Sequence, residues 1–140
     1  VHNTLLAGYI PIITHPERLA YIEADYDKFV ALAEQGAWIQ LTGGSLLGRF
    51  GPRVKRITER FLSDGVTHLL ASDGHNLKNR TPELSEARDA AADIIGTEAA
   101  SLLVLERPAA VIANTDPADV PQPRRQSPTE KKKWFSRLFG

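Results

Sequence analysis

The sequence predicts an α/β fold in which parallel strands alternate with helices. Three short apolar runs, at residues 9–14, 37–41 and 66–71, have the length and composition of buried strands. Each run is followed by a segment with helical periodicity, and strands separated by helices pair in parallel through right-handed crossovers. With 140 residues, 42% of them hydrophobic, the chain can bury one sizeable core.

The first strand and the first full helix follow a short opening segment. Residues 1–8 are typical of the end of a helix that Gly8 closes, and the strand that follows contains Pro11. The next helix is expected to begin at Asp25 and to end at Gly36. Its apolar face consists of Tyr26, Phe29, Val30 and Ala33.

The later helices are marked by proline at their starts and glycine at their ends. Pro52 opens one that ends at Gly65, and Thr81 with Pro82 opens another that ends before Gly96. Their apolar faces are Val54, Ile57, Phe61 and Leu62 in the first, and Leu84, Ala87, Ala91, Ile94 and Ile95 in the second. Two more helices are expected, from Thr97 to about Leu105 and from Pro108 to Ala113.

The amino-acid composition excludes some kinds of site and shows an uneven distribution of charge along the chain. There is no cysteine, which excludes a disulfide framework, a thiolate zinc site and a cysteine nucleophile within these residues. Lys plus Arg and Asp plus Glu number 17 each, but six of the basic residues and one of the acidic residues fall within 121–140. A mildly acidic body therefore carries a basic tail, and zero net charge gives no argument for nucleic acid. Residues 114–140 have the composition of a disordered segment.

Polar residues follow each predicted strand, as sites do at the carboxyl ends of parallel strands. These segments are residues 15–18, 42–48 and 72–76. Asp73 and His75 supply one carboxylate and one imidazole, which suit Mn²⁺, Fe²⁺ or Zn²⁺. In extended backbone, residues two positions apart point to the same side, so the side chains of Asp73 and His75 are expected to face the same way. The same alternation along the first strand points His15 inward, which makes it a potential third ligand. The alternative is that Asp73-Gly74 is an ordinary turn.

The remaining histidines and the arginines have separate expectations. His68 has the opposite parity to Asp73 and is expected to pack against helices, and His2 is expected to be exposed. Arg18 and Arg80 lie in loops beside the proposed ligands, where guanidinium groups match phosphate oxygens. The alternative is that both are surface arginines paired with the neighbouring Glu17 and Glu83. The Gly43-Gly44-Ser45 loop is given no role.

Three motifs together resemble a known family. They are Pro11-Ile12-Ile13-Thr14-His15-Pro16-Glu17-Arg18, then the run from Gln40 to Gly51, QLTGGSLLGRFG, and finally Leu70-Ala71-Ser72-Asp73-Gly74-His75-Asn76 with Arg80. In this order and spacing they resemble the bacterial PHP-type (CpsB/CapC-like) protein-tyrosine phosphatases, manganese-dependent enzymes that control capsular and extracellular polysaccharide synthesis. The resemblance covers residues 1 to about 113.

The resemblance implies a fold, a metal and a substrate. The fold is a distorted seven-stranded β/α barrel, of which residues 1–113 would be the C-terminal half. By resemblance, metal ligands are His15, Asp73 and His75, while Arg18 and Arg80 hold the phosphate. The implied metal is Mn²⁺, with Fe²⁺ or Zn²⁺ as alternatives, and the implied substrate is the phosphotyrosine tail of a bacterial tyrosine kinase. The family's N-terminal His-x-His motif is not found here, so we expect that the chain is truncated and inactive alone.

Two other functions remain open at this point. One is another PHP-domain phosphoesterase, such as a histidinol-phosphatase-like enzyme, and the other is a non-catalytic remnant that binds a kinase or a membrane. Residues 131–139 favour the membrane, because three lysines precede Trp134, Phe135, Leu138 and Phe139 on one helical side. A solvated tail is the alternative. The expected location is cytoplasmic, and peripheral to the inner membrane if the tail binds lipid.

Overall fold

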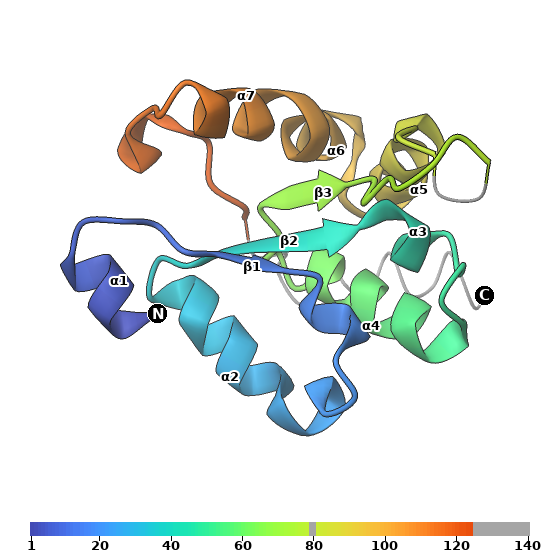
Figure 1. Ribbon diagram of the computed structural model, residues 1–140, viewed down its shortest axis with the longest axis horizontal. Coiled ribbons are helices and arrows are strands. Elements are labelled where there is room, and N and C mark those ends of the chain that lie inside the picture. Colours follow the sequence, from blue (N-terminus) through green and yellow to red (C-terminus); the bar gives the residue numbers. More distant parts are fainter. Residues whose placement is uncertain (79–80, 125–140) are drawn as a thin grey trace.

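The computed structural model describes residues 1–78 and 81–124 and contains a three-stranded parallel sheet (Figure 1). The strands are β1 (Ile12–Thr14), β2 (Trp38–Thr42) and β3 (Leu69–Ala71), in the order β1-β2-β3. Ile13 pairs with Ile39, and Leu41 pairs with Leu70. The predicted alternation of parallel strands and helices is confirmed.

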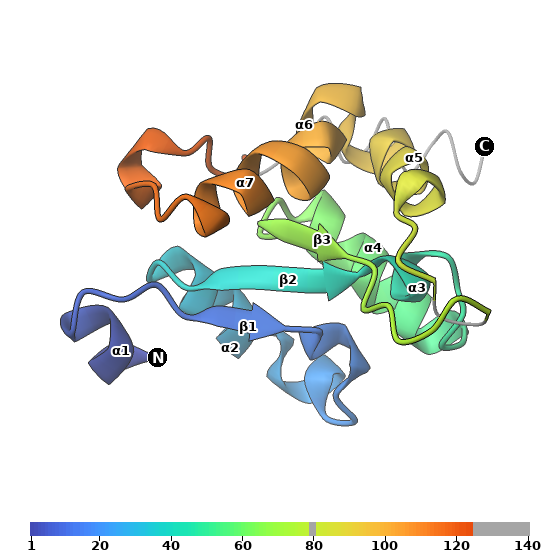
Figure 2. The same ribbon diagram turned by 45° about the horizontal axis from the view of Figure 1, so that its top comes forward.

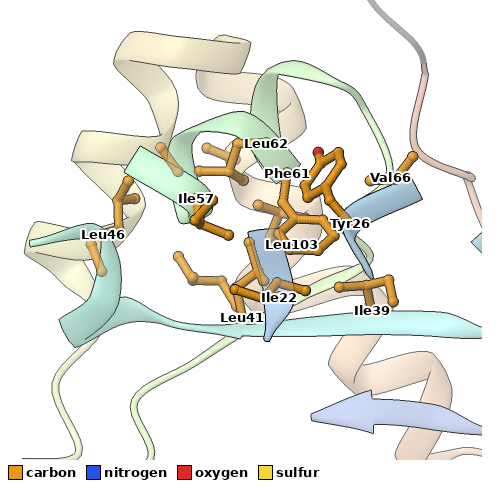
Figure 3. Close-up of a cluster of buried hydrophobic side chains, with 14 residues drawn as sticks. Ile22, Tyr26, Ile39, Leu41, Leu46, Ile57, Phe61, Leu62, Val66 and Leu103 are labelled. Carbon is orange, nitrogen blue, oxygen red and sulfur yellow. The ribbon is translucent and has the colours of Figure 1, made fainter. Parts of the chain in front are cut away.

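The main core lies between the sheet and its helices. Helices α2 (Ile22–Glu34) and α4 (Pro52–Ser63) lie against one face of the sheet (Figure 1). Figure 3 shows Ile39 and Leu41 of β2 meeting this cluster, which includes Phe61 and Leu103. The alternate residue Trp38 points to the other face and packs with a smaller cluster. Both faces of β2 are therefore buried, as expected of a parallel strand.

The remaining helices are α1 (His2–Leu6), α3 (Gly43–Leu46), α5 (Ser85–Ile95), α6 (Thr97–Ser101) and α7 (Arg107–Ile112). A π-helical stretch, Leu102–Glu106, joins α6 to α7, so the two helices expected at 97–113 form one continuous rod. The widened turn directly precedes Pro108, whose ring nitrogen has no hydrogen to donate to the preceding turn. Pro108 therefore modifies this helix without starting a new one.

The starts of two predicted helices differ from the structure, and the strands expected at residues 9–14 and 66–71 are shorter, at Ile12–Thr14 and Leu69–Ala71. Helix α5 begins at Ser85, not at Thr81, and Pro82 instead lies close to the loop after β3, where a Cβ added at Gly74 would be 3.0 Å from the Pro82 Cα. Helix α2 begins at Ile22, three residues before Asp25, and Ile22 itself is fully buried. Its apolar contact with the core explains why the helix extends to this residue.

Most of residues 114–119 are exposed, but Val120 and the Pro121 carbonyl, within the segment whose composition predicts disorder, contact the folded part of the chain. A 3₁₀ turn spans Pro117–Asp119, and Val120 is buried against Trp38 and Leu69. The guanidinium of Arg107 also donates from Nε to the Pro121 carbonyl at 2.7 Å. The burial of Val120 and the hydrogen bond from Arg107 therefore attach this segment to the rest of the folded chain. Residues 131–139, the predicted membrane anchor, lie outside the described residues.

No helix in the described part of the chain is both long enough and apolar enough to span a membrane.

Candidate functional site

The carboxyl ends of the three strands bring three loops to one end of the sheet. The segment after β1 is a 3₁₀ turn, Pro16–Arg18, the segment after β2 is α3, and residues 72–78 follow β3. Figure 2 shows the strands pointing the same way, with these segments at their ends. This is the edge at which the sequence predicts the site.

Arg18 is held between two of these loops. Its Nη1 donates to Asp73 Oδ2 at 3.0 Å, and its Cζ lies 4.3 Å from the centroid of the Phe50 ring. The side chains of Arg18 and Asp73 are 31% and 24% exposed, so the pair is reachable from solvent. The alternative that Arg18 pairs with Glu17 is not what the structure shows, because Glu17 is turned into the interior.

Asp73 and His75 are brought together. His75 Nδ1 lies 2.7 Å from the Asp73 carbonyl oxygen and 3.9 Å from Asp73 Oδ1. A carbonyl oxygen can only accept, so Nδ1 is the donor in this hydrogen bond, and in the neutral tautomer that fits it Nε2 is the nitrogen open to a metal ion. A backbone contact of this kind is the usual way in which the second nitrogen of a metal-binding histidine is oriented.

His15 is placed differently from the expectation. The parity argument requires extended backbone, but His15 has φ +42° and ψ +48°, and Asp73 has φ +51°. Both residues adopt left-handed conformations just beyond their strands, so strand parity does not determine where their side chains point. Only the backbone of His15 continues the sheet, through its N–H to the Gln40 carbonyl at 2.8 Å.

The donor chemistry suits a divalent ion, but the full ligand set is not assembled. Within residues 1–78 and 81–124, no three histidine or carboxylate side chains lie close enough together to hold a metal ion. Asp73 and His75 therefore fit a metal as an adjacent pair, whereas the assignment of His15 stays a prediction. Arg80, the second predicted phosphate ligand, lies outside the described residues.

Glu17 is a buried charged residue that sequence reasoning missed as part of the site. Its side chain is fully buried, and Oε1 accepts hydrogen bonds from Thr42 N at 3.0 Å and Ser45 Oγ at 2.8 Å. Its Oε2 has no hydrogen-bond partner among the described residues. Burial raises the pKa of this carboxyl, against the lowering effect of these two hydrogen bonds.

The Glu17 side chain ties the first loop to the second. It links the 3₁₀ turn that carries Arg18 to the end of β2 and to α3, which gives Ser45 a structural role where the sequence assigned none. No local pattern distinguishes a buried glutamate from a solvated one between Pro16 and Arg18. The sequence feature that could have indicated its burial is its position just after the first strand, because the Gly-Gly-Ser segment that follows the second strand lies at the same edge of the sheet.

His68 lies away from this edge and is packed, as predicted, although its ring lies on the side of the sheet that carries Trp38 and Leu69, which is not the side that strand parity gives. It is buried next to the start of β3, stacks on Trp38 with ring centroids 5.2 Å apart, and accepts from Ile39 N at 3.1 Å. Burial, and then the positive charge of Arg107, lower its pKa to about 4. It is a packed, neutral histidine, and His2 is exposed, also as predicted.

Comparison with known proteins gives consistent matches. Residues 1–113 match the family model described as "Capsular polysaccharide synthesis, CpsB/CapC". The tyrosine-protein phosphatase YwqE of Bacillus subtilis is 41% identical over 86 residues, which is 61% of this chain and 34% of YwqE. The tyrosine-protein phosphatase CpsB of Streptococcus agalactiae is 30% identical over 117 residues, covering 80% of this chain and 48% of CpsB.

A solved structure is similar over most of the chain. It comes from work on YwqE from Bacillus subtilis and CpsB from Streptococcus pneumoniae, described as metal-dependent tyrosine phosphatases. The TM-score is 0.77 at 34% identity, over 89% of this chain and 51% of the solved one. The chain thus spans between a third and a half of the length of the curated relatives described above.

Proposed function

Because this chain belongs to the CpsB/CapC family of capsular polysaccharide synthesis, we propose that it forms part of a metal-dependent protein-tyrosine phosphatase. The observation that carries the proposal is the contact of Arg18 with Asp73, which in turn lies beside His75, at the carboxyl edge of the sheet. The cationic Arg18, which can bind phosphate, thus lies at the same edge as Asp73 and His75, which can bind a metal ion. Metal-assisted phosphomonoester hydrolysis uses this combination.

The residues of this chain have separate roles in the proposed reaction. Arg18 binds oxygens of the phosphate and offsets the charge that builds on them in the transition state. Asp73 and His75, with His15, would hold Mn²⁺, and Arg80 would be a second phosphate ligand. A bound divalent ion supplies Lewis-acid polarisation of the phosphate and of the attacking water. The Glu17 carboxyl keeps the turn that carries Arg18 in place.

The finer parts of the proposal rest on the family. We infer that the three strands belong to a distorted (β/α)7 PHP barrel, and that the substrate is the phosphotyrosine tail of a bacterial tyrosine kinase. The proposed location is cytoplasmic. If residues 131–139 bind lipid, the protein is peripheral to the inner membrane, and truncation after residue 125 should abolish binding to anionic vesicles. Equal vesicle binding by the full chain and the truncated one would contradict the membrane part.

We propose that these 140 residues alone hydrolyse phosphotyrosine peptides weakly or not at all. The chain spans only 34% to 48% of the YwqE and CpsB relatives, and its described residues assemble no group of three metal-binding side chains. Even with His15 as a third ligand, this partial set would hold a divalent ion less tightly than a full ligand set. Strong Mn²⁺-dependent turnover by the isolated chain, lost in His75→Ala, would contradict this part while supporting the phosphatase itself.

The test uses Mn²⁺ as a paramagnetic probe. Titration of the ¹⁵N-labelled chain should broaden the NMR signals of Asp73 and His75 first, while His68 and the exposed His2 stay sharp. His75→Ala should reduce this broadening, whereas the matched control His2→Ala should not. The loaded chain should then bind phosphotyrosine more tightly than a small alkyl phosphomonoester. Broadening centred elsewhere would overturn the metal assignment, and preference for the small ester would favour a histidinol-phosphatase-like substrate.

A further inference from the structure

We propose that Phe50 is a positioning residue that fixes the plane of the Arg18 guanidinium for phosphate binding. The inference rests on the proposed function, because it concerns the arginine that would hold the phosphate. Phe50 touches neither substrate nor metal in this proposal and acts only through Arg18. It adds a second constraint on Arg18, independent of the ion pair with Asp73.

The two contacts of Arg18 restrict different motions. Asp73 Oδ2 lies 3.0 Å from Nη1 and fixes one edge of the guanidinium, but a single hydrogen bond lets the group rotate about that contact. The Phe50 ring lies against the group, with 4.3 Å between the ring centroid and Cζ, which is within the range of a cation–π interaction. Together the contacts hold the fork in one orientation. An arginine so ordered loses less conformational entropy when it binds a phosphate.

The loop that carries Phe50 is itself held in place. Arg49 N donates to the Gly44 carbonyl at 2.9 Å, and Gly51 N donates to the Gly48 carbonyl at 3.0 Å. Gly51 adopts φ +90°, which favours glycine, directly before α4 begins at Pro52. The ring is therefore positioned by turns on both sides and is not part of a free loop.

Gly44 leaves room for the Phe50 ring. A Cβ at Gly44 would lie 3.2 Å from Cε2 of Phe50 and 3.4 Å from Cδ of Arg49, so a side chain there would press on the ring. The absence of a side chain at Gly44, which the sequence placed in a loop and the structure places in α3, therefore has a specific purpose. The second loop thus supports Arg18 in two ways, through the Ser45 contact with Glu17 and through the space left for Phe50.

The test is a double-mutant cycle on the full 140-residue chain loaded with Mn²⁺. Phe50→Leu keeps an apolar side chain but removes the aromatic face, and it should weaken the binding of phosphotyrosine and of inorganic phosphate about two- to fivefold. Phe50→Tyr should restore the affinity of the unmodified chain. In an Arg18→Ala background, Phe50→Leu should have no further effect on either dissociation constant.

A second measurement observes the contact directly in the unmodified chain, with Phe50→Leu as the comparison. The Nε–H resonance of Arg18 should be shifted upfield by the Phe50 ring current and should return toward its ordinary position in Phe50→Leu. Equal weakening by Phe50→Leu with and without Arg18, or an unshifted Nε–H resonance, would overturn the positioning role. Failure of the unmodified chain to bind either phosphate probe, with the shifted resonance present, would instead count against the proposed function.

Discussion

The guanidinium of Arg18 and the carboxylate of Asp73 lie 3.0 Å apart although 55 residues separate them in the sequence. The contact joins the turn after β1 to the loop after β3, across the end of the central strand β2. A proposed phosphate ligand is thereby paired with a proposed metal ligand. Because both side chains are partly exposed, the pair contributes little to stability, and its main consequence is for binding.

Arg18→Ala should therefore reduce binding without unfolding the protein. The loss of a charge-assisted hydrogen bond to phosphate, about 1.5–3 kcal/mol, should weaken phosphotyrosine binding by an order of magnitude or more. The unfolding free energy should change by about 1 kcal/mol at most. Calorimetric titration and urea unfolding measure the two quantities. Arg88→Ala, which breaks an exposed pair with Asp89, is the control and should alter neither; a large loss of stability in Arg18→Ala would contradict the assignment.

Glu17 should make stability depend on pH in an unusual direction for a carboxyl group. Burial raises its pKa in the folded state above the ordinary value of 4.5, so the fold favours the neutral acid. Its favourable contribution is complete below pH 4.5 and declines as pH rises through the raised pKa. The unfolding free energy of the wild type relative to Glu17→Gln should thus fall from pH 4 upward. Urea unfolding measures it, with the exposed Glu98→Gln as control; a difference independent of pH would refute the prediction.

The general architecture could be predicted because apolar runs and helical periodicity are local signals. β2, α4 and the parallel order of the strands follow directly from them. The site could be placed at the carboxyl edge for the same reason, since parallel strands end together. The packed environment of His68 was also predicted, but its ring lies against Trp38 on the side that carries Leu69, whereas strand parity would place it with Leu70.

The rest depended on interactions that a local pattern does not contain. Parity could not place the His15 side chain, since the backbone turns left-handed at that residue. The partner of Arg18 is 55 residues away rather than adjacent, and the burial of Glu17 depends on two groups beyond β2. Val120 lies in a segment whose polar composition predicts exposure, yet its own side chain is buried against Trp38 and Leu69. Composition averaged over the segment could not predict the burial of this one residue.

His68 should make the protein sensitive to acid. Its pKa is lowered to about 4 by burial first and by Arg107 second, whereas an unfolded histidine titrates near 6.5. Its contribution is complete above pH 6.5 and is lost as pH falls toward 4, by an amount of about 3 kcal/mol at most. His68→Asn keeps an acceptor for the Ile39 N–H and should lose less stability between pH 7 and pH 4.5 than the wild type. The exposed His2→Asn should follow the wild type, and an equal acid response in His68→Asn would refute the prediction.

Val120 tests whether the segment beyond residue 113 belongs to the folded unit. Its side chain is 6% exposed and packs on Trp38 and Leu69, and Arg107 holds the neighbouring Pro121 carbonyl. Val120→Ala removes two buried methyl groups and should lower the unfolding free energy by about 1–3 kcal/mol. Val111→Ala, the same change at a side chain that is 42% exposed, should stay within about 0.5 kcal/mol. Urea unfolding compares the two variants, and equal small effects would mean that the segment does not pack in solution as the structure shows. A large effect of Val120→Ala and a small one of Val111→Ala would extend the folded unit past the family match, which ends at residue 113.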